Sequence, residues 1–285
     1  MGRFITGIYN YCDYWCARCP FTQQCRNYVE DPKTMLKASE TETKDAVPAA
    51  VNQEFWDKLA AHLRHAAIFG KHAADVAPWD YDGNNLDDIV ISPEDEAAYD
   101  DEQQAIDAAV RSHRLTRLAD AYETQADTWL TSSQTDAALK DVAVQWMEQA
   151  GRAVGDPADY EDAALELKDL LTVIDWYHTL ISTKLRRALR GHIERERQKK
   201  ARTIPAYASN FSDADGSAKV VLVAIERSMA AWLRLREILP SQEDTVLALL
   251  VLLQQLQRGT QVVLPGAATF RRPGFDPGPN VFDDD

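Results

Sequence analysis

The chain has 285 residues, a hydrophobic content of 45%, a charged content of 27% and a formal net charge of -14; these proportions are typical of a soluble globular protein. Because of this negative charge, we do not expect the surface as a whole to bind nucleic acid or an anionic membrane. There is no N-terminal secretory signal pattern, and the longest apolar run, residues 246–253, is far shorter than the roughly 20 residues that span a bilayer. We therefore expect a cytoplasmic protein without a membrane span.

Residues 1–45 form an aromatic, Cys-rich segment that we expect to bind metal. All four cysteines of the chain, Cys12, Cys16, Cys19 and Cys25, lie within the stretch YCDYWCARCPFTQQC. Their spacing is Cys-x3-Cys-x2-Cys-x5-Cys. Because thiols stay reduced in the cytosol, we do not expect disulfides between them.

Two metal centres suit four thiolates in this spacing. An iron–sulfur cubane can take all its ligands from one compact loop, because the cluster is several ångströms across. Zinc also takes four thiolates, but its usual signature is two short Cys pairs separated by a longer spacer. In addition, Cys19 is followed by Pro20, as a cluster Cys is in bacterial ferredoxins. We therefore predict a [4Fe–4S] cluster on the four cysteines, with Zn2+ as the alternative.

Residues 16–25, CARCPFTQQC, resemble a known iron–sulfur motif. The similarity is to the Cys-x2-Cys-x5-Cys part of the iron–sulfur staple in CRISPR-associated and helicase-linked exonucleases. In that family the fourth Cys lies far away in the sequence, and Cys12 would take its place here. The family's nuclease residues, an Asp followed by Glu-x-Lys on strands, have no match in this chain. The resemblance therefore implies cluster chemistry without nuclease activity.

Residues 46–262 have the apolar spacing of helices and no convincing strands. Three helix starts, at residues 92–95, 156–159 and 241–244, combine an N-cap residue with an acid in the first turn. The expected helices cover residues 52–73, 94–130, 134–150, 157–202, 215–239 and 242–258.

The fold class that we predict is all-α: a helical bundle with a Cys-rich, metal-stapled N-terminal segment. It divides into the segment at 1–45, the bundle at 46–262 and a final stretch at 263–285. That final stretch combines Pro and Gly with an acidic end, which indicates an extended tail.

A second metal site is a further candidate. On the helix expected over 157–202, His178 falls near the middle of the apolar stripe and Asp175 at its edge. Their spacing is that of the Glu-x-x-His motif with which ferritin-like bundles bind metals, and Glu226 could add a carboxylate. Alternatively, His178 is a core residue held by Asp175 or Tyr177, since an unsatisfied buried polar group costs on the order of 1–3 kcal/mol.

Two blocks of charge stand out. Residues 80–107 contain eleven acids and no basic residue, whereas residues 184–202 contain nine Lys/Arg against two Glu. The basic block could bind a protein redox partner or another acidic protein, or pair with the acidic block of the same chain. It lacks interleaved aromatics and any base-reading motif, so we do not expect nucleic-acid binding.

From these patterns we predict an iron–sulfur protein that functions in electron transfer or redox sensing. One alternative is a redox enzyme with a second metal or a substrate pocket in the bundle. The other is a non-enzymatic interaction module with a structural zinc. Catalytic residues, a substrate and the oligomeric state have no signature in the sequence.

Overall fold

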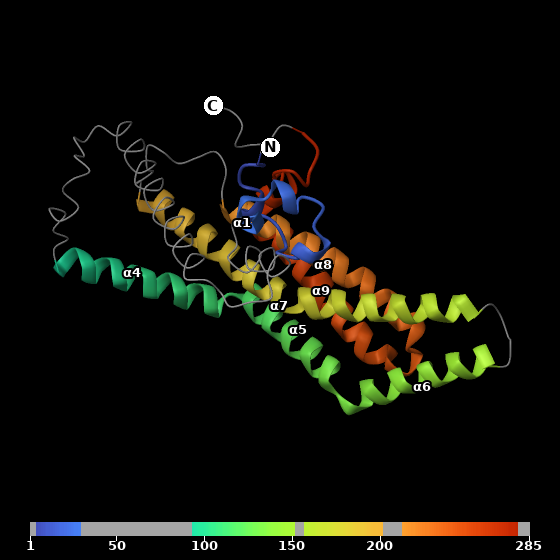
Figure 1. Ribbon diagram of the computed structural model, residues 1–285. Coiled ribbons are helices and arrows are strands. Elements are labelled where there is room, and N and C mark those ends of the chain that lie inside the picture. Colours follow the sequence, from blue (N-terminus) through green and yellow to red (C-terminus); the bar gives the residue numbers. More distant parts are fainter. Residues whose placement is uncertain (1–3, 30–92, 152–156, 202–212, 279–285) are drawn as a thin grey trace, which may run out of the picture. The chain divides into compact units, whose positions relative to one another are not determined.

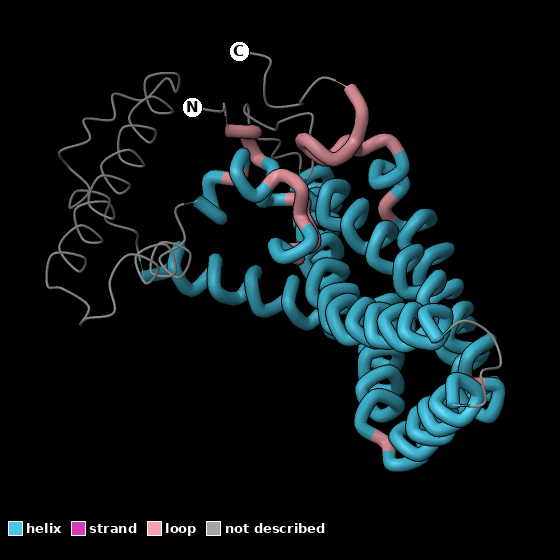
Figure 2. The backbone as a smooth tube through the Cα atoms, turned by 45° about the vertical axis from the view of Figure 1, so that its right-hand side comes forward, coloured by secondary structure: helices cyan, strands magenta, loops and turns pink. Residues whose placement is uncertain are grey.

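A computed structural model describes residues 4–29, 93–151, 157–201 and 213–278. In these residues all regular structure is helical and no strand occurs (Figure 2). The all-α class is therefore confirmed. The helix expected over 52–73 lies outside the described residues.

The chain divides into two compact units. The described part of the first contains Phe4, the 3-10 turn η3 (Thr22–Gln24), the short helix α1 (Arg26–Val29) and the start of α4 (Pro93–Ser112). Within this unit the Arg26 guanidinium lies 5.7 Å from the centre of the Phe4 ring. The second unit comprises residues 5–21 and the chain from residue 103 onward.

The helices of the second unit are long (Figure 1). The longest, α7, begins at Pro157, which suits a first helical position because proline has no N–H to leave unsatisfied. It packs against α5 and α8, and α9 packs against the same two helices. The bounds are α5 Arg114–Thr131, α6 Ser133–Gly151, α7 Pro157–Ala201, α8 Asp213–Ile238 and α9 Glu243–Val263.

A break at His113 corrects the single helix that we expected over 94–130. His113 has an extended backbone, with φ -66° and ψ 140°, and separates α4 from α5. Its Nδ1 accepts a hydrogen bond from the backbone N–H of Leu115 at 3.2 Å, so the imidazole acts as the N-cap of α5. The Thr116 hydroxyl also donates to the carbonyl of Val110 at 2.6 Å. Such side-chain caps satisfy the backbone groups that a break exposes.

The start of α9 also differs from the expectation. A 3-10 turn, η5 (Pro240–Gln242), includes the residue expected as N-cap, Ser241, and α9 begins only at Glu243. The helix then continues to Val263, beyond the expected end at residue 258. Its buried residues Val246, Leu249, Leu253 and Leu256 recur at helical spacing, which explains why one face packs into the bundle.

The core of the second unit joins α5, α7, α8 and α9. Trp232 on α8 is fully buried, with its ring 4.8 Å from that of Trp129 in an edge-to-face arrangement. Its indole N–H donates to the Tyr122 hydroxyl at 3.1 Å. The fully buried apolar residues of α7 form one stripe at helical spacing: Ile174, Tyr177, Ile181, Leu185, Ala188 and Leu189.

The C-terminal segment packs onto the unit, in contrast to the extended tail that we expected at 263–285. It begins with the 3-10 turn η6 (Pro265–Ala268), and Ala267 and Phe270 are buried. The Phe270 ring lies 4.7 Å from the ring of Tyr11. Apolar burial therefore corrects the prediction over residues 265–278; residues 279–285 lie outside the described part.

Gly216 on α8 shows how tightly these rings pack. A Cβ at this position would clash with the ring of Tyr11 and approach Phe270 to 2.8 Å. Only glycine therefore lets both rings lie against the first turns of α8.

In the described part of the chain, one stretch, Pro240–Val263, is long and apolar enough to cross a membrane by length and composition alone. The core helix of a soluble protein passes the same test. Because α9 buries one face in the bundle, its apolar character has a packing role. The absence of a membrane span stays a prediction.

Candidate functional site

The part of the cysteine segment that belongs to the second unit is a chain of tight turns. It contains the 3-10 turns η1 (Ile8–Asn10) and η2 (Cys16–Arg18). Tyr14, with φ 56°, has a left-handed backbone that is uncommon for a residue other than glycine. This conformation needs support from the surrounding structure.

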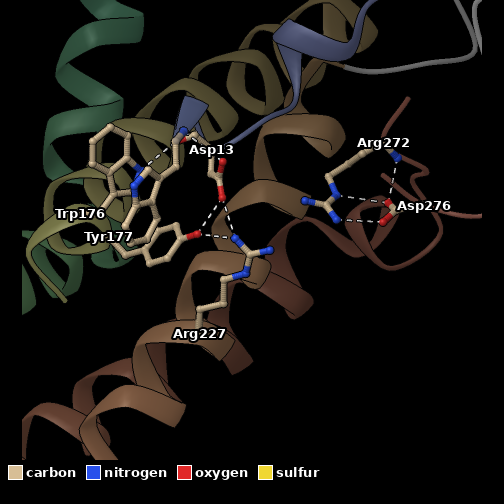
Figure 3. Close-up of polar contacts among 7 residues, drawn as sticks. Asp13, Trp176, Tyr177, Arg227, Arg272 and Asp276 are labelled. Carbon is tan, nitrogen blue, oxygen red and sulfur yellow. Dashed lines mark hydrogen bonds and ion pairs between the residues drawn. The ribbon is translucent and has the colours of Figure 1, made fainter. Parts of the chain in front are cut away.

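Asp13 connects the segment to two helices of the bundle (Figure 3). Its Oδ2 accepts hydrogen bonds from the Tyr177 hydroxyl of α7 and from Nη1 of Arg227 on α8, both at 2.6 Å. Its Oδ1 accepts from the backbone N–H of Trp15 at 3.2 Å, and its backbone carbonyl accepts from the Trp176 indole at 2.9 Å. We call these five residues the Asp13 clasp. Because the carboxylate is mostly buried whereas the Arg227 side chain is half exposed, losing the guanidinium would leave a buried charge uncompensated.

Trp15 provides the apolar part of the same attachment. It is 8% exposed and stacks on Trp176, with 5.2 Å between ring centres and 17° between planes. The guanidinium of Arg18 lies 3.9 Å from the centre of the Trp15 ring and also pairs with Asp169 of α7. Stacked aromatic and cation–π contacts favour one orientation of the segment on α7.

The four cysteines differ in their surroundings, and none is in a disulfide. Burial raises the pKa of the half-buried Cys12 thiol to about 11, and Cys12 donates to the Tyr9 carbonyl at 3.5 Å. Cys16 is exposed. The sulfur of Cys19 accepts a hydrogen bond from the backbone N–H of Phe21 at 3.4 Å.

Cys25 belongs to the first unit and lies between η3 and α1. Its backbone N–H donates to the Thr22 carbonyl at 3.2 Å, and its carbonyl accepts from the Val29 N–H at 3.1 Å. These bonds fix the local turn from which Cys25 projects.

Lys184 is a buried cation next to Cys12. It is 3% exposed; its ammonium lies 4.4 Å from the centre of the Tyr14 ring and donates to the Asn10 carbonyl at 3.5 Å. Burial lowers the pKa of Lys184, whereas the negative charge of a Cys12 thiolate would raise it. The site thus places a positive charge where a thiolate would need one.

The described residues contain no group of three or more His, Cys, Asp or Glu side chains arranged to hold a metal ion. Within the second unit, the thiols of Cys12, Cys16 and Cys19 are therefore not arranged as a set of three metal ligands. Their fit to a metal rests on the donor set: four thiolates are the ligands of both a cubane and a structural zinc.

The second metal site predicted at Asp175, His178 and Glu226 is likewise not assembled. His178 is 7% exposed, as expected for a position in the apolar stripe, but Asp175 and Glu226 are exposed. The imidazole Nδ1 bonds to the backbone carbonyl of Asp175 at 2.7 Å rather than to its carboxylate or to Tyr177. A backbone carbonyl thus satisfies the buried imidazole, as a core histidine requires.

Much of the basic block at 184–202 is paired within the chain. Arg190 forms an ion pair with Asp107, which belongs to the acidic block; residues 80–92 of that block lie outside the described part. Three more arginines of α7 pair with acids of α5 and α8: Arg186 with Asp120, Arg187 with Asp213 and Arg195 with Asp215. An acidic partner would therefore meet a surface whose charge is already partly balanced.

Sequence reasoning missed the residues that hold the cysteine segment. Asp13 lies between two cysteines, and this was the one available signal of its role. Tyr177 and Arg227 are 164 and 214 positions away from it, and no local pattern marks either as a partner.

Comparisons with known proteins do not assign this site to a family. Protein-family models, curated proteins and solved structures gave no match to the chain. The functional conclusion therefore depends on the chemistry of these residues.

Proposed function

We propose that this chain is an iron–sulfur protein that transfers electrons or senses redox state, with a [4Fe–4S] cluster on Cys12, Cys16, Cys19 and Cys25. One observation carries the proposal: all four cysteines of a 285-residue chain fall within one run of closely spaced positions. A cubane accepts four thiolates from such a loop.

The surroundings of Cys19 and Cys12 support a negatively charged centre. Hydrogen bonds to ligand sulfurs tune the potential of a cluster, and the Phe21 N–H is such a donor to Cys19. The buried ammonium of Lys184 near Cys12 would offset part of the negative charge of the thiolates.

The Asp13 clasp supports a role for the bundle as a rigid base. The carboxylate lies directly after Cys12 in the chain and contacts both α7 and α8. Trp15, directly before Cys16, is buried against Trp176. Ligands flanked by anchored residues keep their orientation, and nearby burial sets the potential of the centre.

The test is the iron, acid-labile sulfide and zinc content of the full chain purified without oxygen. We expect about four iron and four sulfide per chain, with a broad absorption near 400 nm that bleaches with dithionite. Cys12→Ser should remove most of the cluster. Tyr14→Phe, in the same segment but without loss of a thiol, should keep it and serves as the matched control.

Other metal contents would lead to different conclusions. One zinc, no sulfide and no visible absorption would overturn the redox function and leave a structural zinc in an interaction module. Iron beyond the cubane complement, lost in His178→Ala while the cluster remains, would favour the enzyme with a second metal.

A further inference from the structure

A pocket of about 540 Å³ opens beside the cysteine segment within the second unit. Four stretches far apart in the sequence line it: the cysteine segment, α7, α8 and the segment after η6. Its volume is within the range of small-molecule sites, which commonly form where several elements meet.

Small side chains on α8 make the hollow. Ala230 and Ala231 line the pocket together with Leu170 and Val173 of α7 and Phe275 of the C-terminal segment. The methyl groups of two consecutive alanines leave space that a larger side chain at either position would reduce. The greater part of the lining is apolar, with aromatic rings at Trp15, Tyr177 and Phe275 among it.

Two arginines supply positive charge to this apolar pocket. Arg18 and Arg227 line it together with one acid, Asp13. Both carboxylate oxygens of Asp13 already accept hydrogen bonds, and its charge is balanced by Arg227. The lining therefore keeps a net positive charge from Arg18, whose pair with Asp169 is exposed and thus weak.

Among the described residues, the hydrogen bonds of the Arg227 guanidinium are made by one of its nitrogens. Nη1 makes the contacts with Asp13 and with the Tyr177 hydroxyl. In Figure 3 the rest of the group points away from these two partners. A guanidinium presents its donors as a fork that matches a carboxylate, sulfonate or phosphate, so this edge can receive an anion without breaking the clasp.

We propose that this pocket binds a small organic anion with an aromatic body. The ring system lies against Val173, Ala230 and Phe275, and the anionic group bonds to the free edge of Arg227, with Arg18 adding attraction. Apolar contact gives affinity in such a site, and a few fixed polar groups give orientation. None of the residues that contact the proposed ligand is a proposed cluster ligand, although Cys19 also lines the pocket.

The test is a fluorescence titration of the full chain with 8-anilinonaphthalene-1-sulfonate and with its uncharged analogue N-phenyl-1-naphthylamine. The two probes share their rings and differ in the sulfonate. We expect the sulfonate probe to bind at least about tenfold more tightly, as one charge-assisted contact provides. Arg227→Lys, which keeps a cation beside Asp13 but has no fork of donors, should reduce this preference and leave the uncharged probe within about threefold of its original affinity.

A second variant fills the space without touching the clasp. Ala230 lines the pocket and is exposed, so Ala230→Trp should block both probes while the unfolding temperature stays close to that of the parent. The matched controls are Arg234→Gln, an exposed arginine of the same helix outside the lining, and Ala248→Trp, an exposed alanine of α9. Both controls should bind like the parent.

Two results would overturn the inference. If the two probes bind equally well, the pocket has no preference for an anion. If Ala230→Trp binds the sulfonate probe as tightly as Ala248→Trp does, the probe occupies another surface.

Discussion

The helical bundle and the cysteine segment of the second unit are stabilised in different ways. The bundle buries whole stripes of Leu, Ile and aromatic side chains, and six helices, α4 to α9, contribute to one continuous core. Within residues 5–21 only Ile8, Tyr11 and Trp15 are buried hydrophobics. The segment instead depends on the Asp13 clasp and on stacked rings.

This difference matters for how each region responds to change. Apolar burial is spread over many side chains, so a bundle loses stability in proportion to the volume removed. A clasp concentrates its free energy in a few hydrogen bonds, and removing one partner leaves others unsatisfied. The bundle should therefore unfold as a whole, whereas the segment can detach locally.

The largest effect is expected from a cavity in the bundle. Trp232→Ala removes a fully buried ring together with its hydrogen bond to Tyr122. We expect the free energy of unfolding to fall by about 3–5 kcal/mol, measured by urea denaturation followed by circular dichroism. A loss below about 1 kcal/mol, the typical effect of any substitution, would contradict the assignment of this ring to the core.

Alkaline pH tests the bundle through one buried phenol. Burial raises the pKa of Tyr122 to about 12 from its ordinary value of 10.0. Between pH 10 and 12 the unfolded chain releases this proton and the folded chain keeps it. As the pH rises over this range, the contribution of Tyr122 to the free energy of unfolding therefore falls by about 2–3 kcal/mol. Tyr122→Phe should lose less stability than the parent over the same pH range in urea denaturation. Parallel curves for the two proteins would contradict this role for Tyr122.

Loss of the Asp13 carboxylate should separate the two regions. We expect Asp13→Ala to weaken the attachment of residues 5–21 by about 1–3 kcal/mol, because Tyr177 and Arg227 lose their shared acceptor. Hydrogen exchange in the segment should then accelerate by roughly ten- to hundredfold, with α8 and α9 unchanged. Asp169→Asn, which removes the exposed partner of Arg18, is the control and should show little acceleration. Equal acceleration in the core helices would mean that the segment and the bundle open together.

The smallest effect is expected at the surface of the bundle. Arg186 of α7 and Asp120 of α5 form an ion pair in which both side chains are nearly half exposed. A double-mutant cycle with Arg186→Gln and Asp120→Asn should give a coupling of about 0.2–1 kcal/mol, which decreases with added salt. A coupling that is larger and insensitive to salt would show that the pair is shielded from solvent.

Several elements could be predicted from the sequence because their signals are local. Pro157 at a first helical position and the apolar stripe after it placed α7 almost to the residue. The break at His113 could not be predicted in this way, because the residues on either side of it continue a helical pattern. It depends on a side-chain cap and on the Thr116 bond to Val110, which only the folded backbone brings together.

The candidate site likewise has features that the sequence shows and features that it does not. The cysteines and their spacing were visible at once, and so was the position of His178 within the apolar stripe. The partner of His178 was not, since a backbone carbonyl took the place of the expected side chains. Every residue has a backbone carbonyl, so the amino-acid sequence cannot show which carbonyl bonds to the imidazole.

The sequence by itself determined the helical class, most helix positions and the one cluster of thiols, because periodicity, capping residues and ligand spacing are short-range properties. Only the tertiary structure decided how the cysteine segment is held, and that the chain after α9 is packed rather than extended as far as residue 278. Both depend on contacts between distant residues, such as Asp13 with Arg227 and Tyr11 with Phe270. The free energy of such contacts exists only once the bundle has formed and excluded water around them.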